Sequence, residues 1–262
     1  MSTATVGGTT IAYDDTGGDG PVVVLAHGFL MDRTMFGPQV AALRDDYRVI
    51  TWDERGFGET VYDGEPFTYW DSAADCLGLM DHLGIDRAVV GGMSQGGFIS
   101  LRVALLAPER VRGLVLLDTQ AGTEDAEVIP LYQGMIDDWV ANGPSDELAA
   151  TTASIIIGEP ELSDAWAAIW KARPPEELRN PGNALIERES IADRLGEITA
   201  PALVVHGTSD VAITMDKAEA LAAALPGCAG VVTVEGGSHS ANLTHPGPVN
   251  DAILAFLAGL PD

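Results

Sequence analysis

The 262-residue sequence predicts an α/β fold built on a mostly parallel sheet. Short, β-branched and nearly continuous apolar runs recur along the chain, as in strands that are buried on both faces. These runs alternate with longer stretches of helical periodicity, and such alternation implies parallel strands joined by right-handed crossovers. With 46% hydrophobic and 20% charged residues, the chain also has enough apolar surface to fold.

The first predicted element is an antiparallel hairpin at one edge of the sheet. Residues 3–6 and 9–15 alternate between polar and apolar side chains, and Gly7 and Gly8 lie between them as a turn.

The sheet and its flanking helices follow in order. Further strands are predicted at residues 22–26, 48–51, 88–90, 111–117, 202–205 and 231–234. Helices are predicted at residues 35–43, 69–83, 95–106, 216–225 and 248–260. In the second of these helices, apolar residues recur at intervals of three and four, which predicts a stripe that faces the sheet.

The alternation breaks between residues 120 and 197. Only residues 155–157 resemble a strand there, and pairs such as Gly143-Pro144 and Pro174-Pro175 separate several helical stretches. A segment of this length inside a compact domain needs structure of its own. We therefore predict a core of residues 1–119 and 198–262, with residues 120–197 inserted as a helical cap.

The charge balance restricts the partners. The chain has 39 Asp plus Glu against 14 Lys plus Arg, a net charge of −25, which repels nucleic acid and anionic membranes. No apolar run reaches the roughly 18 residues of a membrane span, and no Lys or Arg precedes Arg33, so we expect a cytoplasmic protein. Cys76 and Cys228 are expected to be free thiols, and neither a metal site nor a cofactor is expected.

The strongest chemical signal is the segment Gly92-Met93-Ser94-Gln95-Gly96, which lies between a predicted strand and a predicted helix. A serine in a strained turn between a strand and a helix, flanked by glycines, projects its hydroxyl above the sheet as a nucleophile. The alternative is an ordinary glycine-rich turn in which the serine caps the next helix.

With these residues the chain resembles the α/β-hydrolase fold family. The resemblance covers nearly the whole chain and includes His27-Gly28-Phe29 after the first core strand and residues 53–58 after the second, besides the serine segment. Within the family it looks most like small bacterial serine esterases, lactonases similar to 3-oxoadipate enol-lactonase, and cofactor-free haloperoxidases. The family order of nucleophile, acid and histidine implies Ser94, Asp210 and His239.

The residues support the same triad separately. A serine hydroxyl needs a histidine base, and the histidine needs a carboxylate that holds its tautomer. Of the five histidines, only His239 lies in a small-residue loop after the last strand, and Asp210 follows the strand at 202–205. Asp118 directly ends the strand at 111–117 and is the rival acid, unless it only forms a hydrogen bond where the cap begins.

Two backbone amides are the predicted oxyanion hole. The amide of Gln95 opens the helix after Ser94, and His27-Gly28 lets the amide of Phe29 fold over the serine. The Phe29 ring either lines the acyl pocket or packs in the core. Arg33 and Arg55 could bind a substrate carboxylate, although structural salt bridges are favoured.

The aromatic residues of the predicted cap give an expectation about the substrate pocket. Trp139, Trp166, Trp170 and Tyr132 are predicted to face the serine, where they would favour neutral, apolar groups, or else to attach the cap to the core. Residues 120–197 also contain 16 acidic and 5 basic residues. This excess would repel anionic substrates.

The predicted function is hydrolysis of a small carboxylic ester or lactone through an acyl-enzyme. Two alternatives remain open. The same triad could form peracids or act as a cofactor-free haloperoxidase with hydrogen peroxide, or the fold could serve as a ligand-binding receptor with negligible turnover. The sequence indicates neither the natural substrate nor the oligomeric state.

Overall fold

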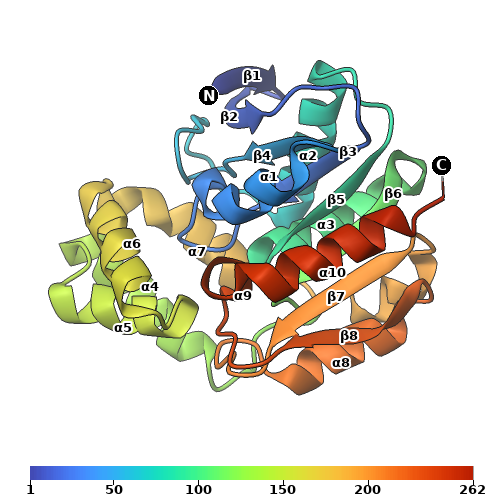
Figure 1. Cartoon of the computed structure of the whole chain (residues 1–262). Coiled ribbons are helices and arrows are strands. Elements are labelled where there is room, and N and C mark those ends of the chain that lie inside the picture. Colours follow the sequence, from blue (N-terminus) through green and yellow to red (C-terminus); the bar gives the residue numbers. More distant parts are fainter. Residues whose placement is uncertain (262) are drawn as a thin grey trace.

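The computed structural model describes residues 1–261, and they form one eight-stranded sheet with helices on both faces (Figure 1). The strand order is β1-β2-β4-β3-β5-β6-β7-β8, with β1 and β2 antiparallel and β3 to β8 parallel to one another. The strands are β1 (Ser2–Val6), β2 (Thr9–Asp15), β3 (Val22–Ala26), β4 (Arg48–Trp52), β5 (Ala88–Met93), β6 (Val111–Leu117), β7 (Ala202–Gly207) and β8 (Cys228–Val234). The predicted α/β-hydrolase fold with its N-terminal hairpin is confirmed.

Helices cover the two faces of the sheet in separate layers. One layer contains α1 (Gly37–Leu43) and α10 (Pro246–Ala258), and the other contains α2 (Tyr69–His82), α3 (Gln95–Leu106) and α8 (Met215–Ala224); the short α9 (Ala241–Thr244) precedes α10. Alternate strand residues serve the two layers. In β3, Val24 and Ala26 face the layer of α2 and α3, whereas Val23 and Leu25 face the layer of α1 and α10.

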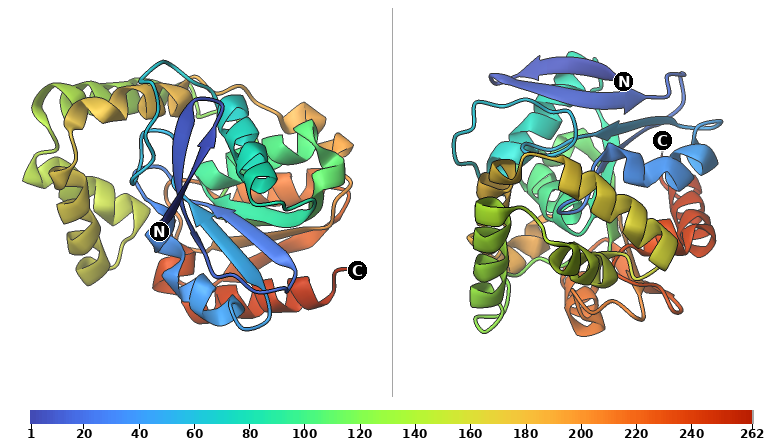
Figure 2. Two further views of the ribbon diagram at one scale, coloured as in Figure 1. Left: turned by 90° about the horizontal axis from the view of Figure 1, so that it is seen from above. Right: turned by 90° about the vertical axis from the view of Figure 1, so that its left-hand side faces the viewer.

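The segment between β6 and β7 is helical and lies to one side of the sheet (Figures 1 and 2). It contains α4 (Ile129–Asn142), α5 (Asp146–Ile156), α6 (Pro160–Ala172) and α7 (Arg179–Ile186). The arrowheads of β7 and β8 point toward it in Figure 1. No helix of the described residues 1–261 is long and apolar enough to cross a membrane.

Two predicted elements differ from the structure, and one ambiguous run is resolved by it. The run at 155–157, which resembles a strand in the sequence, lies at the end of α5, where Ile156 and Ile157 are buried and Ile155 is exposed. The single helix predicted at 35–43 begins as a 3-10 turn, Arg33–Phe36, before α1. Strand β8 is not buried on both faces, because it lies at the edge of the sheet and Val232 is exposed.

Candidate active site

Ser94 lies in a strained turn between β5 and α3. Its backbone has φ 50° and ψ −110°, in the region that residues other than glycine rarely adopt, and such strain is found mainly at functional sites. Two contacts from the end of β6 hold the turn: the Ser94 amide donates to the Leu117 carbonyl at 2.9 Å, and the Thr119 hydroxyl donates to the Ser94 carbonyl at 2.7 Å. These contacts hold the backbone of Ser94 in its unusual conformation.

The glycines that flank Ser94 are required by close backbone packing. A Cβ atom on Gly92 would lie 2.3 Å from the carbonyl oxygen of Ala26 in β3, and one on Gly96 would lie 1.9 Å from the same oxygen. Any side chain at either position would collide with backbone, so the turn can approach β3 only with glycine at both sites.

His239 and Asp210 form a direct hydrogen-bonded pair at the ends of β8 and β7. The His239 Nδ1 atom lies 2.8 Å from Asp210 Oδ2. The other carboxylate oxygen, Oδ1, accepts from the amides of Ala212 at 2.8 Å and Ile213 at 3.0 Å. Burial alone would raise the pKa of Asp210, but the charge and hydrogen bond of His239 hold it below its usual value. Asp210 is thus held ionised, and it fixes the orientation of the imidazole.

Ser94 and His239 line one pocket of about 660 Å³, part of which is open to solvent. Most of the wall is apolar and comes from both the core and the helical segment, including Phe29, Leu30, Met93, Phe98, Leu185 and Ile213. The serine and the histidine therefore face a common apolar space.

Asp118, the rival acid, contacts backbone rather than a histidine base. The residue is 1% exposed and has a φ of 46°. Its carboxylate accepts from the amide of Gly207 at 2.8 Å and from the amide of Ala241 at 3.3 Å. Burial, with the nearby charge of Asp210, raises the pKa of Asp118 well above its usual value. Asp118 thus connects the loop that carries Asp210 to the loop that carries His239.

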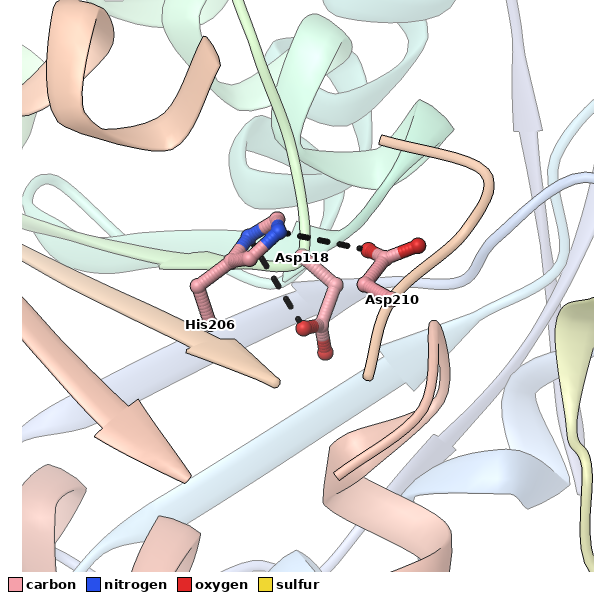
Figure 3. A group of neighbouring side chains, drawn as sticks. All are labelled: Asp118, His206 and Asp210. Atoms are coloured by element: carbon pink, nitrogen blue, oxygen red, sulfur yellow. Dashed lines mark ion pairs between the residues drawn. The ribbon is translucent and has the colours of Figure 1, made fainter. Parts of the chain in front are cut away.

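His206 completes a buried cluster with the two aspartates (Figure 3). Its Nε2 atom lies 2.8 Å from the Ile213 carbonyl, so it donates a hydrogen bond, and it is also 3.4 Å from Asp210 Oδ2. Its Nδ1 atom lies 3.9 Å from Asp118 Oδ1. These three side chains are close enough to hold a metal ion. His206 Nε2 and both carboxylates already form hydrogen bonds within the protein, whereas His206 Nδ1 has no hydrogen-bond partner among the described residues. The hydrogen bonds of the cluster hold the Asp210 loop in place.

The amides of Phe29 and Gln95 are both available to a ligand. In the described residues 1–261, neither amide donates to a protein acceptor. The Gln95 side chain is fixed beneath the turn, since its amide group donates to Glu54 and its carbonyl accepts from the Tyr69 hydroxyl at 3.0 Å. Burial raises the pKa of Glu54 well above its usual value. This buried chain of side chains holds the start of α3 in place.

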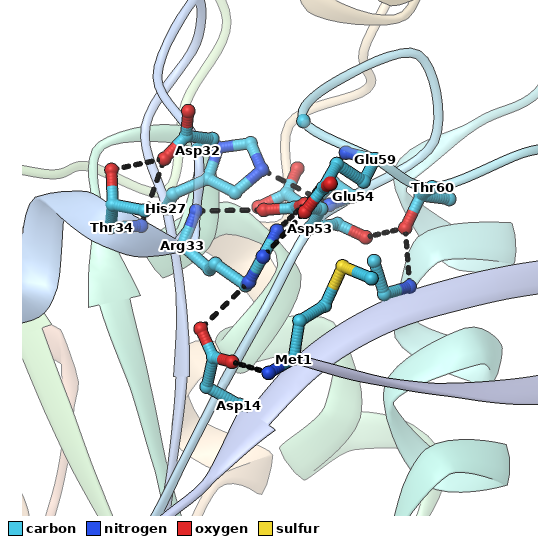
Figure 4. A network of polar contacts seen from close by, with 12 residues as sticks. Met1, Asp14, His27, Asp32, Arg33, Thr34, Asp53, Glu54, Glu59 and Thr60 are labelled. Carbon is cyan, nitrogen blue, oxygen red and sulfur yellow. Dashed lines mark hydrogen bonds and ion pairs between the residues drawn. The ribbon is translucent and has the colours of Figure 1, made fainter.

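The loop that carries Phe29 is held by His27 and by a polar network around Arg33 (Figure 4). His27 Nε2 accepts from the Glu54 amide at 3.0 Å, so its Nδ1 donates to the Gly28 carbonyl at 2.8 Å. Arg33 forms ion pairs with three carboxylates, those of Asp14, Asp53 and Glu59. Arg55 pairs with Asp75. Neither arginine lines the pocket, so both take the structural role that was favoured for them.

The three tryptophans predicted either to face the serine or to attach the cap to the core do not line the pocket of Ser94, so their positions agree with attachment. Of the four aromatic residues proposed for the pocket, Tyr132 lines it, whereas Trp139, Trp166 and Trp170 are buried elsewhere between the helical segment and the core. The Trp170 indole donates to the Leu30 carbonyl at 2.6 Å. A buried indole needs an acceptor for its N–H group, and this contact supplies one at the joint between the segment and the core.

Several supporting residues were missed by the sequence analysis. Thr119 holds the Ser94 carbonyl, Glu54 and Tyr69 hold Gln95, and Glu124 lines the pocket. For Thr119 a signal was available, because it follows the same strand end as Asp118. For the others, which rely on partners far away in the sequence, no local pattern marks the contact.

The chain belongs to the alpha/beta hydrolase fold family, whose model matches residues 21–246. Among solved structures it is similar to a thermophilic esterase from Thermogutta terrifontis, with 29% identity, a TM-score of 0.89 and coverage of 98% of this chain and 97% of the other. It is also similar to the enol-lactonase from Burkholderia xenovorans LB400, with 28% identity, a TM-score of 0.88 and coverage of 98% and 100%.

Two curated relatives have other names. A Synechocystis sp. protein with the provisional name non-heme chloroperoxidase is 28% identical, over 94% of each chain. A Caulobacter segnis protein with the provisional name carbamate hydrolase is 29% identical, over 99% of this chain and all of the other. The chain is therefore a member of a hydrolase family whose relatives include proteins named as esterases, lactonases, haloperoxidases and carbamate hydrolases.

Proposed function

We propose that this protein is a serine hydrolase that cleaves an uncharged carboxylic ester or lactone through an acyl-enzyme. The observation that carries the proposal is that the strained Ser94 and the Asp210-bound His239 line the same apolar pocket. Residues 120–197 act as a cap that supplies the outer wall of this pocket. The esterase and the enol-lactonase with similar structures support the same chemistry.

The reaction follows from the placement of the groups. Because Nδ1 of His239 donates to Asp210, its Nε2 carries the lone pair and removes the proton from the Ser94 hydroxyl. Ser94 Oγ attacks the carbonyl carbon, and the amides of Phe29 and Gln95 stabilise the resulting oxyanion. Nε2 then returns the proton to the leaving alkoxide, and the acyl group stays on Ser94. Water, activated by the same imidazole, releases the acid and restores the serine.

A second candidate uses the same groups with a different nucleophile in the last step. If hydrogen peroxide attacks the acyl-enzyme in place of water, the product is a peracid. A cofactor-free haloperoxidase would act through this perhydrolysis reaction. The name of the Synechocystis relative favours keeping this candidate. Hydrolysis and perhydrolysis compared on one acyl donor distinguish the two.

The test of the proposal is covalent labelling together with turnover. A fluorophosphonate should label the wild-type protein with one equivalent, and a panel of aryl esters, aliphatic esters and lactones should include substrates that are hydrolysed. Ser94→Ala should abolish both. Ser154→Ala is the matched control, since that exposed hydroxyl only bonds within α5 and its loss should change neither. Full labelling of Ser94→Ala would exclude Ser94 as the nucleophile.

A further inference from the structure

The apolar pocket contains one carboxylate that the proposed reaction does not use. Glu124 lines the same pocket as Ser94 and His239, although its side chain is only 8% exposed. Burying an ionised carboxylate is costly unless it is paired. The partner is Arg188, whose Nη2 atom lies 2.7 Å from Glu124 Oε1.

Arg188 is fixed and cannot serve the substrate. Its side chain is 2% exposed, and each of its three nitrogens has a partner: Nε donates to the Gly122 carbonyl, Nη1 to the Leu185 carbonyl and Nη2 to Glu124. The guanidinium also lies over the Phe98 ring, 4.3 Å from its centroid. A substrate carboxylate therefore finds no free cation at this end of the pocket.

Glu124 still has an acceptor to offer. Arg188 binds Oε1, and among the described residues 1–261 no hydrogen bond reaches Oε2. Tyr132, which also lines the pocket, has a raised pKa because it is buried and because the charge of Glu124 is near. The pocket thus has an apolar wall interrupted by one carboxylate, and a substrate donor that replaces water at its free oxygen would form a charge-assisted hydrogen bond.

Resting on the proposed function, we propose that Glu124 selects esters or lactones that carry an uncharged N–H or O–H donor remote from the scissile carbonyl. A neutral donor is favoured over an ammonium group because Arg188, directly behind the carboxylate, opposes a second cation. A substrate carboxylate is disfavoured because it would face the Glu124 oxygen. The middle of such a substrate is apolar, as the Phe29, Met93 and Ile213 side chains in the wall require.

The substitution Glu124→Gln should reverse the selection. Its carboxamide oxygen must remain toward the Arg188 donor, because the opposite orientation would place two donors against each other. Its NH₂ group then faces the pocket and offers a donor where glutamate offered an acceptor. Glu127→Gln is the matched control, because Glu127 is exposed and belongs to the same segment.

The experiment measures binding without turnover. Three neutral esters of equal length, ending in hydroxyl, methyl or methoxy, are titrated calorimetrically into Ser94→Ala, alone and combined with Glu124→Gln or Glu127→Gln. We expect the hydroxyl ester to bind Ser94→Ala roughly tenfold more tightly than the methyl ester, because only the hydroxyl can form a charge-assisted hydrogen bond with Glu124. Glu124→Gln should remove this preference and favour the methoxy ester, whereas Glu127→Gln should keep it.

Two results would overturn the inference: equal affinities of Ser94→Ala for the hydroxyl and methyl esters, or an unchanged preference in Glu124→Gln. The first needs no variant at position 124, so it decides the question even where Glu124→Gln fails to fold. Failure of the proposed function would look different. In that case the wild-type protein would show no turnover dependent on Ser94, while the binding preference at Glu124 would still be measurable.

Discussion

Replacing Asp210 by asparagine tests the acid, because the surrounding backbone dictates how the new side chain must lie. Oδ1 of Asp210 accepts from the amides of Ala212 and Ile213, while Oδ2 faces His239 Nδ1. In Asp210→Asn the carboxamide oxygen stays with the two amides, so its NH₂ group faces the imidazole. Nδ1 must then accept and Nε2 must carry the proton, which is the wrong tautomer for a base.

The size of the loss can be bounded. In serine proteases, the same replacement of the triad aspartate by asparagine gives the wrong histidine tautomer and lowers kcat roughly 10⁴-fold, and we take that value as the upper bound. The correct tautomer is possible only if the asparagine carboxamide flips. The flip places its NH₂ group against the amides of Ala212 and Ile213, at a cost of roughly 1–3 kcal/mol for each amide. A flip that costs about 2–6 kcal/mol restores the correct tautomer in about one molecule in 30 to one in 10⁴. We therefore expect kcat to fall by roughly 30- to 10⁴-fold.

Asp118→Asn is the matched control, because Asp118 belongs to the same buried cluster but accepts from the amides of Gly207 and Ala241, and the histidine it faces is His206 rather than His239. It should keep kcat within about tenfold. The assay is steady-state hydrolysis of one active ester by both variants, with circular dichroism as the check on folding. A larger loss in Asp118→Asn than in Asp210→Asn would refute the assignment of the acid.

Three other perturbations have expected outcomes. Gly96→Ala places a Cβ 1.9 Å from a backbone oxygen and should lower Tm by at least about 4 °C. The control Gly134→Ala, whose Cβ would lie in open space on α4, should instead raise the free energy of unfolding by about 0.5–1 kcal/mol. Calorimetry measures both variants, and equal Tm values would contradict the packing argument. Burial raises the pKa of Asp118 in the folded state, so the stability that this group contributes is fully present below its usual pKa near 3.8 and is lost as the pH rises through the folded pKa. The free energy of unfolding of Asp118→Asn, measured by denaturation, should therefore increase relative to that of the wild type as the pH rises from about 4. A difference in stability that does not depend on pH would contradict the raised pKa. Esters with a free carboxylate should have lower kcat/KM than matched neutral esters, because the helical segment of residues 120–197 is acidic. The difference in kcat/KM should become smaller as salt screens these charges. Higher kcat/KM for the anionic esters at low salt would contradict the argument.

The sheet and the strained serine were predictable because their signals are local. A β-branched run bounded by turn residues indicates a strand, and Ser94 with its flanking glycines forms one short motif between a strand and a helix, although the backbone that requires these glycines belongs to β3. The sequence also brings Asp118 and Asp210 to the same edge of the sheet. It does not say which carboxylate meets the imidazole, because that depends on how two loops, 29 residues apart at Asp210 and His239, fold over each other.

The pocket wall was less predictable because it depends on how the helices of residues 120–197 are rotated. Helix α6 carries both Trp166 and Trp170, and an apolar stripe has the same spacing whether it faces the core or the pocket. The structure turns it toward the core. Glu124 was equally hidden, since its partner Arg188 lies 64 residues further along the chain.

The bond between Trp170 and Leu30 has a consequence for exchanging parts between relatives. Leu30 has a φ of 65° and directly follows Phe29, so the indole fastens the strained backbone beside a proposed oxyanion donor. The three proposed triad residues and the two proposed oxyanion amides lie outside residues 120–197. Exchanging this segment would therefore alter substrate selectivity without replacing any residue proposed for catalysis. A transplanted segment must nevertheless bring its own N–H donor for the Leu30 carbonyl. It must also keep an acceptor for Ser238, which neighbours His239 and donates to the Ile157 carbonyl. Selectivity and rate are therefore separable only where the exchanged segment preserves these contacts with the two loops of the site.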